Sequence, residues 1–278
     1  MTTTLRPSGP ERRQADGGWA RSYAVCVNSR MVGGIELAVD PRYGPAVGRI
    51  AALAIAADDR RRGRGTVAML AAEEVLRYRG CTRVEISVPA DAAHGLRIAA
   101  ALGYAELNRT MGKALEGAAG AGGRHPLPAG STPRPLSDAE YGTWHDAERA
   151  SYIAELVARG VPREQAVGHE AAAFAAAMPD GPATEGTALL CLDHRGTTVG
   201  HLWLRVTEPA YVFSVAVDAA HRGRGHGRTL MLAAENAAGD AGAATIGLSV
   251  FAGNTPALGL YHSLGYRTLV THFAKPLG

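Results

Sequence analysis

The chain has 278 residues, which at about 100–200 residues per domain predicts two small domains. Hydrophobic residues make up 46% and charged residues 20%, a globular composition that excludes disordered, collagen-like and fibrous proteins. The net charge is only +3 and the arginines are dispersed, which argues against a nucleic-acid-binding surface.

The cysteines and the apolar runs predict a cytoplasmic protein. Cys26, Cys81 and Cys191 are an odd number and lie far apart, so neither a disulfide framework nor a metal site is expected. No apolar run approaches the ~20 residues that span a bilayer, and the polar start lacks the apolar core of a signal peptide. The Ala- and Arg-rich, Lys-poor usage resembles that of proteins from GC-rich bacterial genomes.

The chain contains a tandem duplication. Residues 49–104 align without a gap on 211–266 at an offset of 162, with 19 identities in 56 pairs. Lys113 and Leu115 also fall on Lys275 and Leu277. Because this period far exceeds the ~20–50 residues of a solenoid unit, each copy should be a domain.

A Gly-, Ala- and Pro-rich segment separates the copies. It shows no apolar periodicity, as expected of an exposed linker. We therefore predict an N-terminal domain over 1–115, a linker over 116–133 and a C-terminal domain over 134–278.

The second copy shows the predicted elements most clearly. Strand-forming residues fill 197–206, 210–217 and 244–251, while helical spacing marks 227–239. A further helix starts at Asn254, a good N-cap, and ends at Gly265. Strands alternating with helices predict an α/β (α+β) fold.

A glycine- and arginine-rich loop lies between a strand and a helix in both copies. It reads Arg222-Gly223-Arg224-Gly225-His226-Gly227 in the second copy and Arg60-Arg61-Arg62-Gly63-Arg64-Gly65 in the first. Glycines let backbone N–H groups turn inward, and the following helix adds its positive end, so the loop suits a pyrophosphate. It is neither a Walker loop nor the dinucleotide fingerprint.

With this loop, the second copy resembles the GNAT superfamily of N-acetyltransferases. The match extends through "VFSVAVDAAHRGRGHGRTLMLAAE" and "LSVFAGNTPALGLYHSLGY". The resemblance implies two GNAT-like domains in tandem, each with a mixed, mostly antiparallel sheet flanked by helices. It also implies acetyl-CoA as the cofactor and transfer of its acetyl group to an amine by direct attack in a ternary complex. The scattered histidines form no metal constellation, so no metal is expected.

The resemblance assigns roles to residues of the second copy. Asn254 would contact the cofactor and Tyr261 would protonate the departing thiolate. The other residues expected to bind the cofactor are Val215, Ala216, Val217, Arg222, Gly223, Arg224, Gly225, His226, Gly227 and Arg228.

The first copy departs from this pattern. Ala92 and Ala99 replace Asn254 and Tyr261, and the copy lacks the stretch 137–178, which forms two predicted helices on the acceptor side of the second. We expect it not to catalyse. Whether it binds coenzyme A or only supports the second domain stays open; the residues of that possible site are Leu53, Ile55, Arg60, Gly63, Arg64, Gly65 and Thr66.

The general base of the second copy is not assigned by the sequence, because the strand before the loop carries no carboxylate. An ammonium group must lose a proton before it attacks. The candidates are Glu148, Glu155, a water chain ending on Ser214, and His201. Tyr152 and Ser214 are candidates for contact with the acceptor.

Two functions remain open at this stage. The first is an N-acetyltransferase acting on a small-molecule amine, with chemistry in the C-terminal domain. The second is a non-catalytic acyl-CoA-binding sensor or regulatory module. We expect no nucleic-acid or membrane partner, and either a monomer that imitates a dimer internally or a homodimer.

Overall fold

The computed structural model describes residues 3–13, 17–39, 46–115, 124–158 and 161–278. The chain divides into two compact units, Met1–Arg109 with Leu269–Gly278, and Thr110–Thr268. Part of the predicted linker, 116–123, lies outside the described residues.

The first unit is a sheet in the order β1-β3-β4-β5-β6-β13, with β2 on β3. Its core gathers apolar residues from the strands and from α1, including Val25, Leu37 and Leu76. The elements are β1 (Thr3–Pro7), β2 (Arg12–Arg13), β3 (Trp19–Val27), β4 (Arg30–Val39), β5 (Val47–Ile55), α1 (Arg64–Tyr78), β6 (Arg83–Pro89), α2 (Ala93–Ala101) and β13 (Arg267–Pro276).

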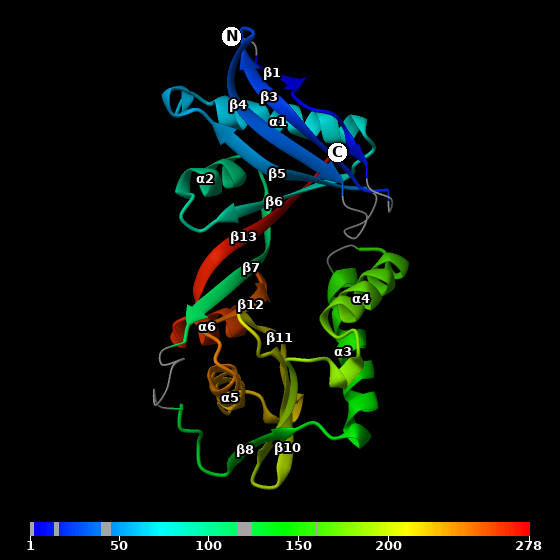
Figure 1. The fold of residues 1–278 in the computed structure, drawn as a ribbon, viewed down its shortest axis with the longest axis vertical. Helices are drawn as coiled ribbons and strands as arrows, with labels where there is room; N and C mark the ends of the chain where they lie inside the picture. The colour runs from blue at the N-terminus through cyan, green and yellow to red at the C-terminus, as the bar shows by residue number, and fades with distance from the viewer. Residues whose placement is uncertain (1–2, 14–16, 40–45, 116–123, 159–160) are drawn as a thin grey trace. The chain divides into compact units, whose positions relative to one another are not determined.

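The second unit is a sheet in the order β7-β12-β11-β10-β9-β8. Helices α3 and α4 lie on one side of this sheet and α5 on the other (Figure 1). The elements are β7 (Ala105–Ala114), β8 (Ser131–Pro135), α3 (Asp138–Ala158), α4 (Arg163–Ala177), β9 (Thr187–His194), β10 (Thr197–Arg205), β11 (Ala210–Val217), α5 (His226–Asp240), β12 (Thr245–Phe251) and α6 (Thr255–Ser263).

The predicted elements of the second copy are confirmed. Strand β11 has the predicted bounds, and the two helices expected in 137–178 form as α3 and α4. Asn254 caps α6 by accepting a hydrogen bond at Oδ1 from Ala257 N at 3.2 Å. Gly265 follows α6 with φ +89°, a left-handed conformation that glycine adopts without strain.

The last strand of each copy differs from its predicted place. The prediction assigned 134–278 to one domain, whereas Leu269–Gly278 belong to the first unit and Thr110–Ala114 to the second. Strand β13 pairs with β6 from Val270 opposite Pro89 to Pro276 opposite Arg83. Because β7 and β13 are copies of one strand, either can complete either sheet.

Both sheets contain a β-bulge at the point where a pair of parallel strands stops pairing. Strand β11 pairs with β12 only over Ala210–Val212, although β11 runs on to Val217. At this point the register of β10 against β11 shifts between Trp203 and Leu204, so Phe213 is an extra residue on β11. Strands β5 and β6 likewise pair only up to Ile50, next to a register shift in β4–β5. The bulge bends the strand and opens the sheet beyond it.

Gly200 allows β10 to approach β11 beside the bulge, which gives a stability prediction. A Cβ at Gly200 would lie 2.4 Å from the backbone oxygen of Ala216, a contact that only backbone movement relieves. We expect Gly200→Ala to lower the free energy of unfolding by roughly 1–3 kcal/mol. Gly168→Ala, in α4 with open space around its Cβ, should raise it by up to about 1 kcal/mol. Denaturant titration of both variants measures this; equal effects would contradict the close approach.

Within the described ranges, no helix has the length and apolar character needed to cross a membrane.

Candidate functional site

The glycine-rich loop of the second copy leads from β11 into the N-terminus of α5. Gly223 and Gly225 have φ of +76° and +87°, and Gly225 is the N-cap of α5. No atom lies within 4 Å of a Cβ built at either glycine, so the space above them is open. The side chain of Arg222 is held to the end of β11, since its Nε donates to Val217 O at 3.0 Å.

The loop presents a row of unused backbone donors. Among the described residues, the N–H groups from Gly223 to Arg228 have no hydrogen-bond acceptor, whereas Thr229 N donates to Gly225 O at 3.1 Å. Several converging N–H groups at the positive end of a helix bind an anion such as a pyrophosphate. The residues therefore fit the group that the sequence predicts for this loop.

Tyr261 lies on α6, the helix next to this loop. Gly227 of α5 faces α6, because a Cβ there would lie 3.4 Å from Leu260 Cδ2 and 3.9 Å from Val217 Cγ2. The ring of Tyr261 packs 5.9 Å from that of Tyr266. Burial raises the pKa of the Tyr261 phenol above its usual value, so it keeps its proton at neutral pH.

On the other side of the sheet, the bulge decides which β11 side chains face α3. Ser214 is paired with Trp203, which packs against Trp144 of α3 at a ring distance of 5.8 Å. Cross-strand partners point to the same face, so Ser214 also faces α3. His201 shares the face of Trp203, since the two are separated by one residue along β10.

Glu148 of α3 meets these two residues. Its carboxylate lies near the Ser214 hydroxyl and the His201 ring. Burial is the strongest influence and raises the pKa of Glu148, while Ser214 and His201 act in the opposite direction. Three of the four candidates for the base therefore form one cluster. Glu155 lies two helical turns farther along α3, and its role stays a prediction.

Tyr152, one turn from Glu148 on α3, lies near a residue that the sequence did not single out. Tyr211 of β11 lies near Tyr152, Ser249 of β12 and Arg205, whose guanidinium is 6.0 Å from its ring centre. Burial raises the pKa of the Tyr211 phenol. Only the position of Tyr211 just before the bulge could have pointed to it, and the register of the bulge is not visible in the sequence.

Ion pairs hold helices α3 and α4 in place. Arg149 of α3 forms two hydrogen bonds to the buried carboxylate of Glu170 on α4, at 2.8 and 3.0 Å. Arg134 of β8 joins Glu140 at the start of α3 to Asp193 of β9. Arg134 lowers the pKa of the Glu140 carboxyl. The first pair holds α3 to α4 and the second holds the start of α3 to the sheet, so together they constrain the position of Glu148.

The first copy has the glycine-rich loop but lacks the other site features of the second copy. Arg60 Nε donates to Ile55 O at 2.8 Å, and Gly63 caps α1 with φ +71°, as Arg222 and Gly225 do in the second copy. Arg64, by contrast, is buried in an ion pair with Asp59. Gly34 and Ala52 stand at the register positions of His201 and Ser214. In the described part of the first unit no helix pair like α3–α4 covers that face.

The model of the acetyltransferase (GNAT) family matches residues 3–104 and 142–266. The chain therefore belongs to the acetyltransferase (GNAT) family, as a tandem of two such domains with a truncated first copy. Members of this family generally bind acetyl-CoA. Among the residues with described positions, no group of three or more His, Cys, Asp or Glu side chains is arranged to hold a metal.

Solved structures share the fold. A GCN5-related N-acetyltransferase from Sphaerobacter thermophilus is 19% identical, with a TM-score of 0.59 over 92% of this chain and 80% of that one. A tandem GNAT protein from the clavulanic acid biosynthesis pathway is also 19% identical, with a TM-score of 0.51 over 96% and 85%. A GCN5-related N-acetyltransferase from Kribbella flavida is 14% identical, with a TM-score of 0.50 over 88% and 86%. No curated protein matches the sequence.

Proposed function

We propose that the protein is an acetyl-CoA-dependent N-acetyltransferase acting on a small-molecule amine, with its chemistry in the second copy. The observation that carries this proposal is the arrangement around β11. Unused loop donors lie at its carboxyl end beside α6, the helix that carries Tyr261, and Glu148, Ser214 and His201 lie close together on the face toward α3. The first copy retains only the loop.

The residues of the second copy divide the chemistry as follows. Backbone N–H groups from Gly223 to Gly227 hold the pyrophosphate, while β11 beyond Val212 offers its unpaired edge to the rest of the cofactor. Bound acetyl-CoA supplies the activated acetyl thioester. Glu148 accepts the proton of the acceptor amine, directly or through Ser214, and Tyr261 donates its proton to the departing sulfur. Backbone donors of Val215–Val217 stabilise the developing negative charge.

The first copy is proposed as a second, non-catalytic acyl-CoA site. In its loop too, the N–H groups from Arg61 to Thr66 have no acceptor among the described residues, and Gly65 packs toward Ile98 as Gly227 does toward Leu260. This geometry supports binding, whereas Ala99, at the position of Tyr261, cannot donate a proton.

The stoichiometry of acetyl-CoA binding tests both proposals. We expect two molecules per chain by native mass spectrometry, and one in each of the matched variants Gly225→Glu and Gly63→Glu, which place a carboxylate in the respective loop. The two glycines have similar φ, so the backbone strain of the variants is comparable. One molecule in the wild type and none in Gly225→Glu would leave the first copy without a site. No binding at all would reject the acetyltransferase function.

A second measurement tests Tyr261. We expect Tyr261→Phe to bind acetyl-CoA as the wild type does but to lose about 10²–10⁴-fold in kcat, the usual contribution of a general acid. Tyr211→Phe serves as a comparison, because it removes a buried phenol outside the α6 side of the site. Undiminished turnover of Tyr261→Phe with any amine that the wild type acetylates would reject its role as the acid.

A further inference from the structure

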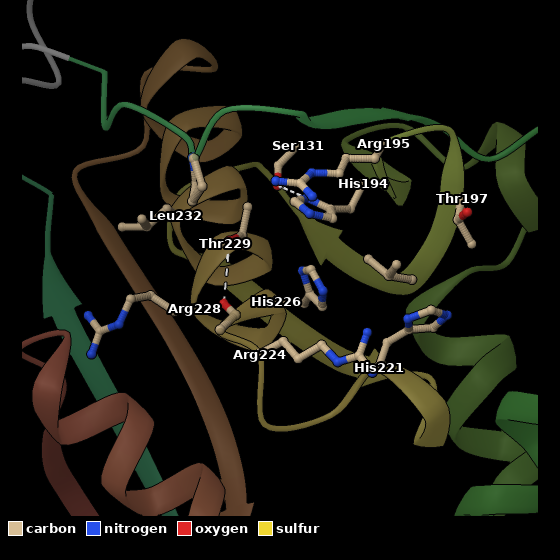
Figure 2. Close-up of a pocket in the computed structure, with 13 residues that line it drawn as sticks. Ser131, His194, Arg195, Thr197, His221, Arg224, His226, Arg228, Thr229 and Leu232 are labelled. Atoms are coloured by element: carbon tan, nitrogen blue, oxygen red, sulfur yellow. Dashed lines mark hydrogen bonds between the residues drawn. The ribbon is translucent and has the colours of Figure 1, made fainter.

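The second unit contains a cavity on the flank of α5 away from α6. Its volume is about 550 Å³. It is bounded by the N-terminus of α5, the turn between β9 and β10, and the segment leading into β8 (Figure 2). The lining residues are Pro128, Ser131, His194, Arg195, Thr197, Val199, His221, Arg224, Gly225, His226, Arg228, Thr229 and Leu232.

The lining is cationic and hydroxyl-rich. It includes three arginines, three histidines, Ser131, Thr197 and Thr229, but no carboxylate. Figure 2 shows His194 and Arg195 on one side of His226, with His221 and Arg224 on the other. Arg228 is turned toward α6, where its Nη2 donates to Ser263 Oγ at 2.5 Å. Such a set of donors, at the positive end of a 15-residue helix, recognises an anion.

His226 is the side chain that points to a ligand. It is only 6% exposed, lines the cavity, and has no hydrogen-bond partner for its ring nitrogens among the described residues. The His194 ring lies 4.9 Å and the His221 ring 6.4 Å from it. His194 is fixed by a 2.9 Å hydrogen bond between its Nδ1 and Ser131 Oγ. Because the His226 ring nitrogens have no partner within the described chain, a molecule held in the cavity can hydrogen-bond to them.

In the first copy, residues of the chain itself form ion pairs at the position that corresponds to this cavity. By the repeat alignment, Asp59 corresponds to His221 and Arg64 to His226. Asp59 is buried and forms ion pairs with Arg64 and Arg30, the latter through hydrogen bonds of 2.7 and 2.9 Å. The first copy therefore supplies its own carboxylate where the second has only cationic and neutral groups.

We propose that this cavity binds a small phosphate-bearing molecule beside the coenzyme A site: the side chains of Arg224 and His226 face the cavity, while the backbone N–H groups of the same loop serve the cofactor. The cavity falls within the ~300–1,000 Å³ of small-molecule pockets and exceeds the size of a bare phosphate. The two sites use opposite flanks of one helix end, because Gly227 packs toward Leu260 whereas His226 lies against His194. Arg195, His194 and His226 bind the phosphate oxygens, and Leu232, Val199 and Pro128 provide an apolar wall.

Binding should involve uptake of a proton. Burial, followed by the charges of His194, His221 and Arg224, lowers the pKa of His226, so its imidazole is neutral at pH 7. A bound phosphate counters those charges and favours the protonated ring. Affinity for the phosphate dianion, whose own second pKa is about 6, should therefore increase as the pH falls toward 6.

The test uses inorganic phosphate as the probe on the full-length protein saturated with coenzyme A. The imidazole signals are followed by NMR at constant ionic strength. We expect saturable shifts of the His194, His221 and His226 signals, and at least 10-fold weaker affinity in the double variant His194→Gln, Arg195→Asn. Glutamine can keep the bond to Ser131, and asparagine tolerates the φ of +52° at Arg195. Arg267→Gln removes an exposed arginine elsewhere in the unit and is the matched control.

Three outcomes would overturn the proposal. The histidine signals would show no saturable change, or Arg267→Gln would weaken binding as much as the double variant, or coenzyme A would abolish the phosphate shifts because the cavity is part of its own site. Coenzyme A binding is measured first and separately. If it is absent, the proposed acetyltransferase function fails, while the phosphate titration of the free protein still tests the cavity.

Discussion

Glu148→Gln is expected to lower kcat/KM by about 10²–10⁴-fold, the usual range for loss of a general base. The glutamine keeps the size of the side chain and can still hydrogen-bond Ser214, but it cannot take a proton from the amine. Steady-state kinetics with any accepted amine measures the loss. Asp146→Asn makes the same chemical change on the exposed face of α3 and should change kcat/KM little.

The pH profile separates this role from a structural one. Burial raises the pKa of Glu148, so the acidic limb of kcat/KM should lie above the ordinary carboxyl value of 4.5 and disappear in Glu148→Gln. Because the folded state binds this proton more tightly than the unfolded state, wild-type stability falls as the pH rises through the interval between the two pKa values. Glu148→Gln should therefore be more stable than the wild type at neutral pH, and this gain should vanish below the ordinary value.

The variant Glu155→Gln tests the alternative that Glu155 is the general base. If Glu155 is the base, Glu155→Gln loses activity and the acidic limb of the kcat/KM profile, whereas Glu148→Gln retains both. Retention of both activity and the limb in Glu148→Gln would reject the assignment to Glu148.

The sequence predicted the candidate residues of this site but not which of them lie close together in space. Glu148, His201 and Ser214 were each candidates on the evidence of residue type and segment. Which of them come together depends on Phe213, the extra residue on β11, because a one-residue change of register moves a side chain to the opposite face. The bulge carries no glycine or proline signal in "AYVFSVAV", so alternation alone could not locate it.

His194 and His221 were missed for a related reason, and His226 was predicted only as part of the cofactor loop. His194, His221 and His226 lie on different elements and are far from any metal-ligand spacing, so the sequence showed them as scattered. The loop and helix capping, by contrast, were predictable because they depend on local chemistry. Gly225 and Asn254 act within a few residues of their own positions.

The exchange of the last strands could not be predicted because the repeat makes the partners equivalent. Lys113 aligns with Lys275 and Glu73 with Glu235, so either lysine suits either glutamate. In the structure, Lys275 Nζ lies 2.7 Å from Glu73 Oε2, and Lys113 Nζ lies 2.8 Å from Glu235 Oε2. Each lysine therefore pairs with the glutamate of the other copy.

Lys275→Met should consequently destabilise the first unit rather than the copy from which Lys275 comes. The Glu73 side chain is only 4% exposed, and besides Lys275 it has Tyr104, whose hydroxyl donates to it at 3.0 Å. Removal of the cation leaves a buried carboxylate unpaired, which costs about 3–5 kcal/mol of unfolding free energy. Arg12→Met breaks the solvent-exposed pair with Glu36 and should cost at most about 1 kcal/mol.

Two further measurements identify the cause and the place of this loss. The double variant Lys275→Met, Glu73→Gln removes the buried charge, so most of the stability should return. Hydrogen exchange should show weakened protection in α1, which contains Glu73, and in β6, which pairs with β13. Protection in α5 should be unchanged. Loss of protection around Glu235 in α5 would mean that β13 completes the sheet of its own copy, and the exchange of strands would be wrong.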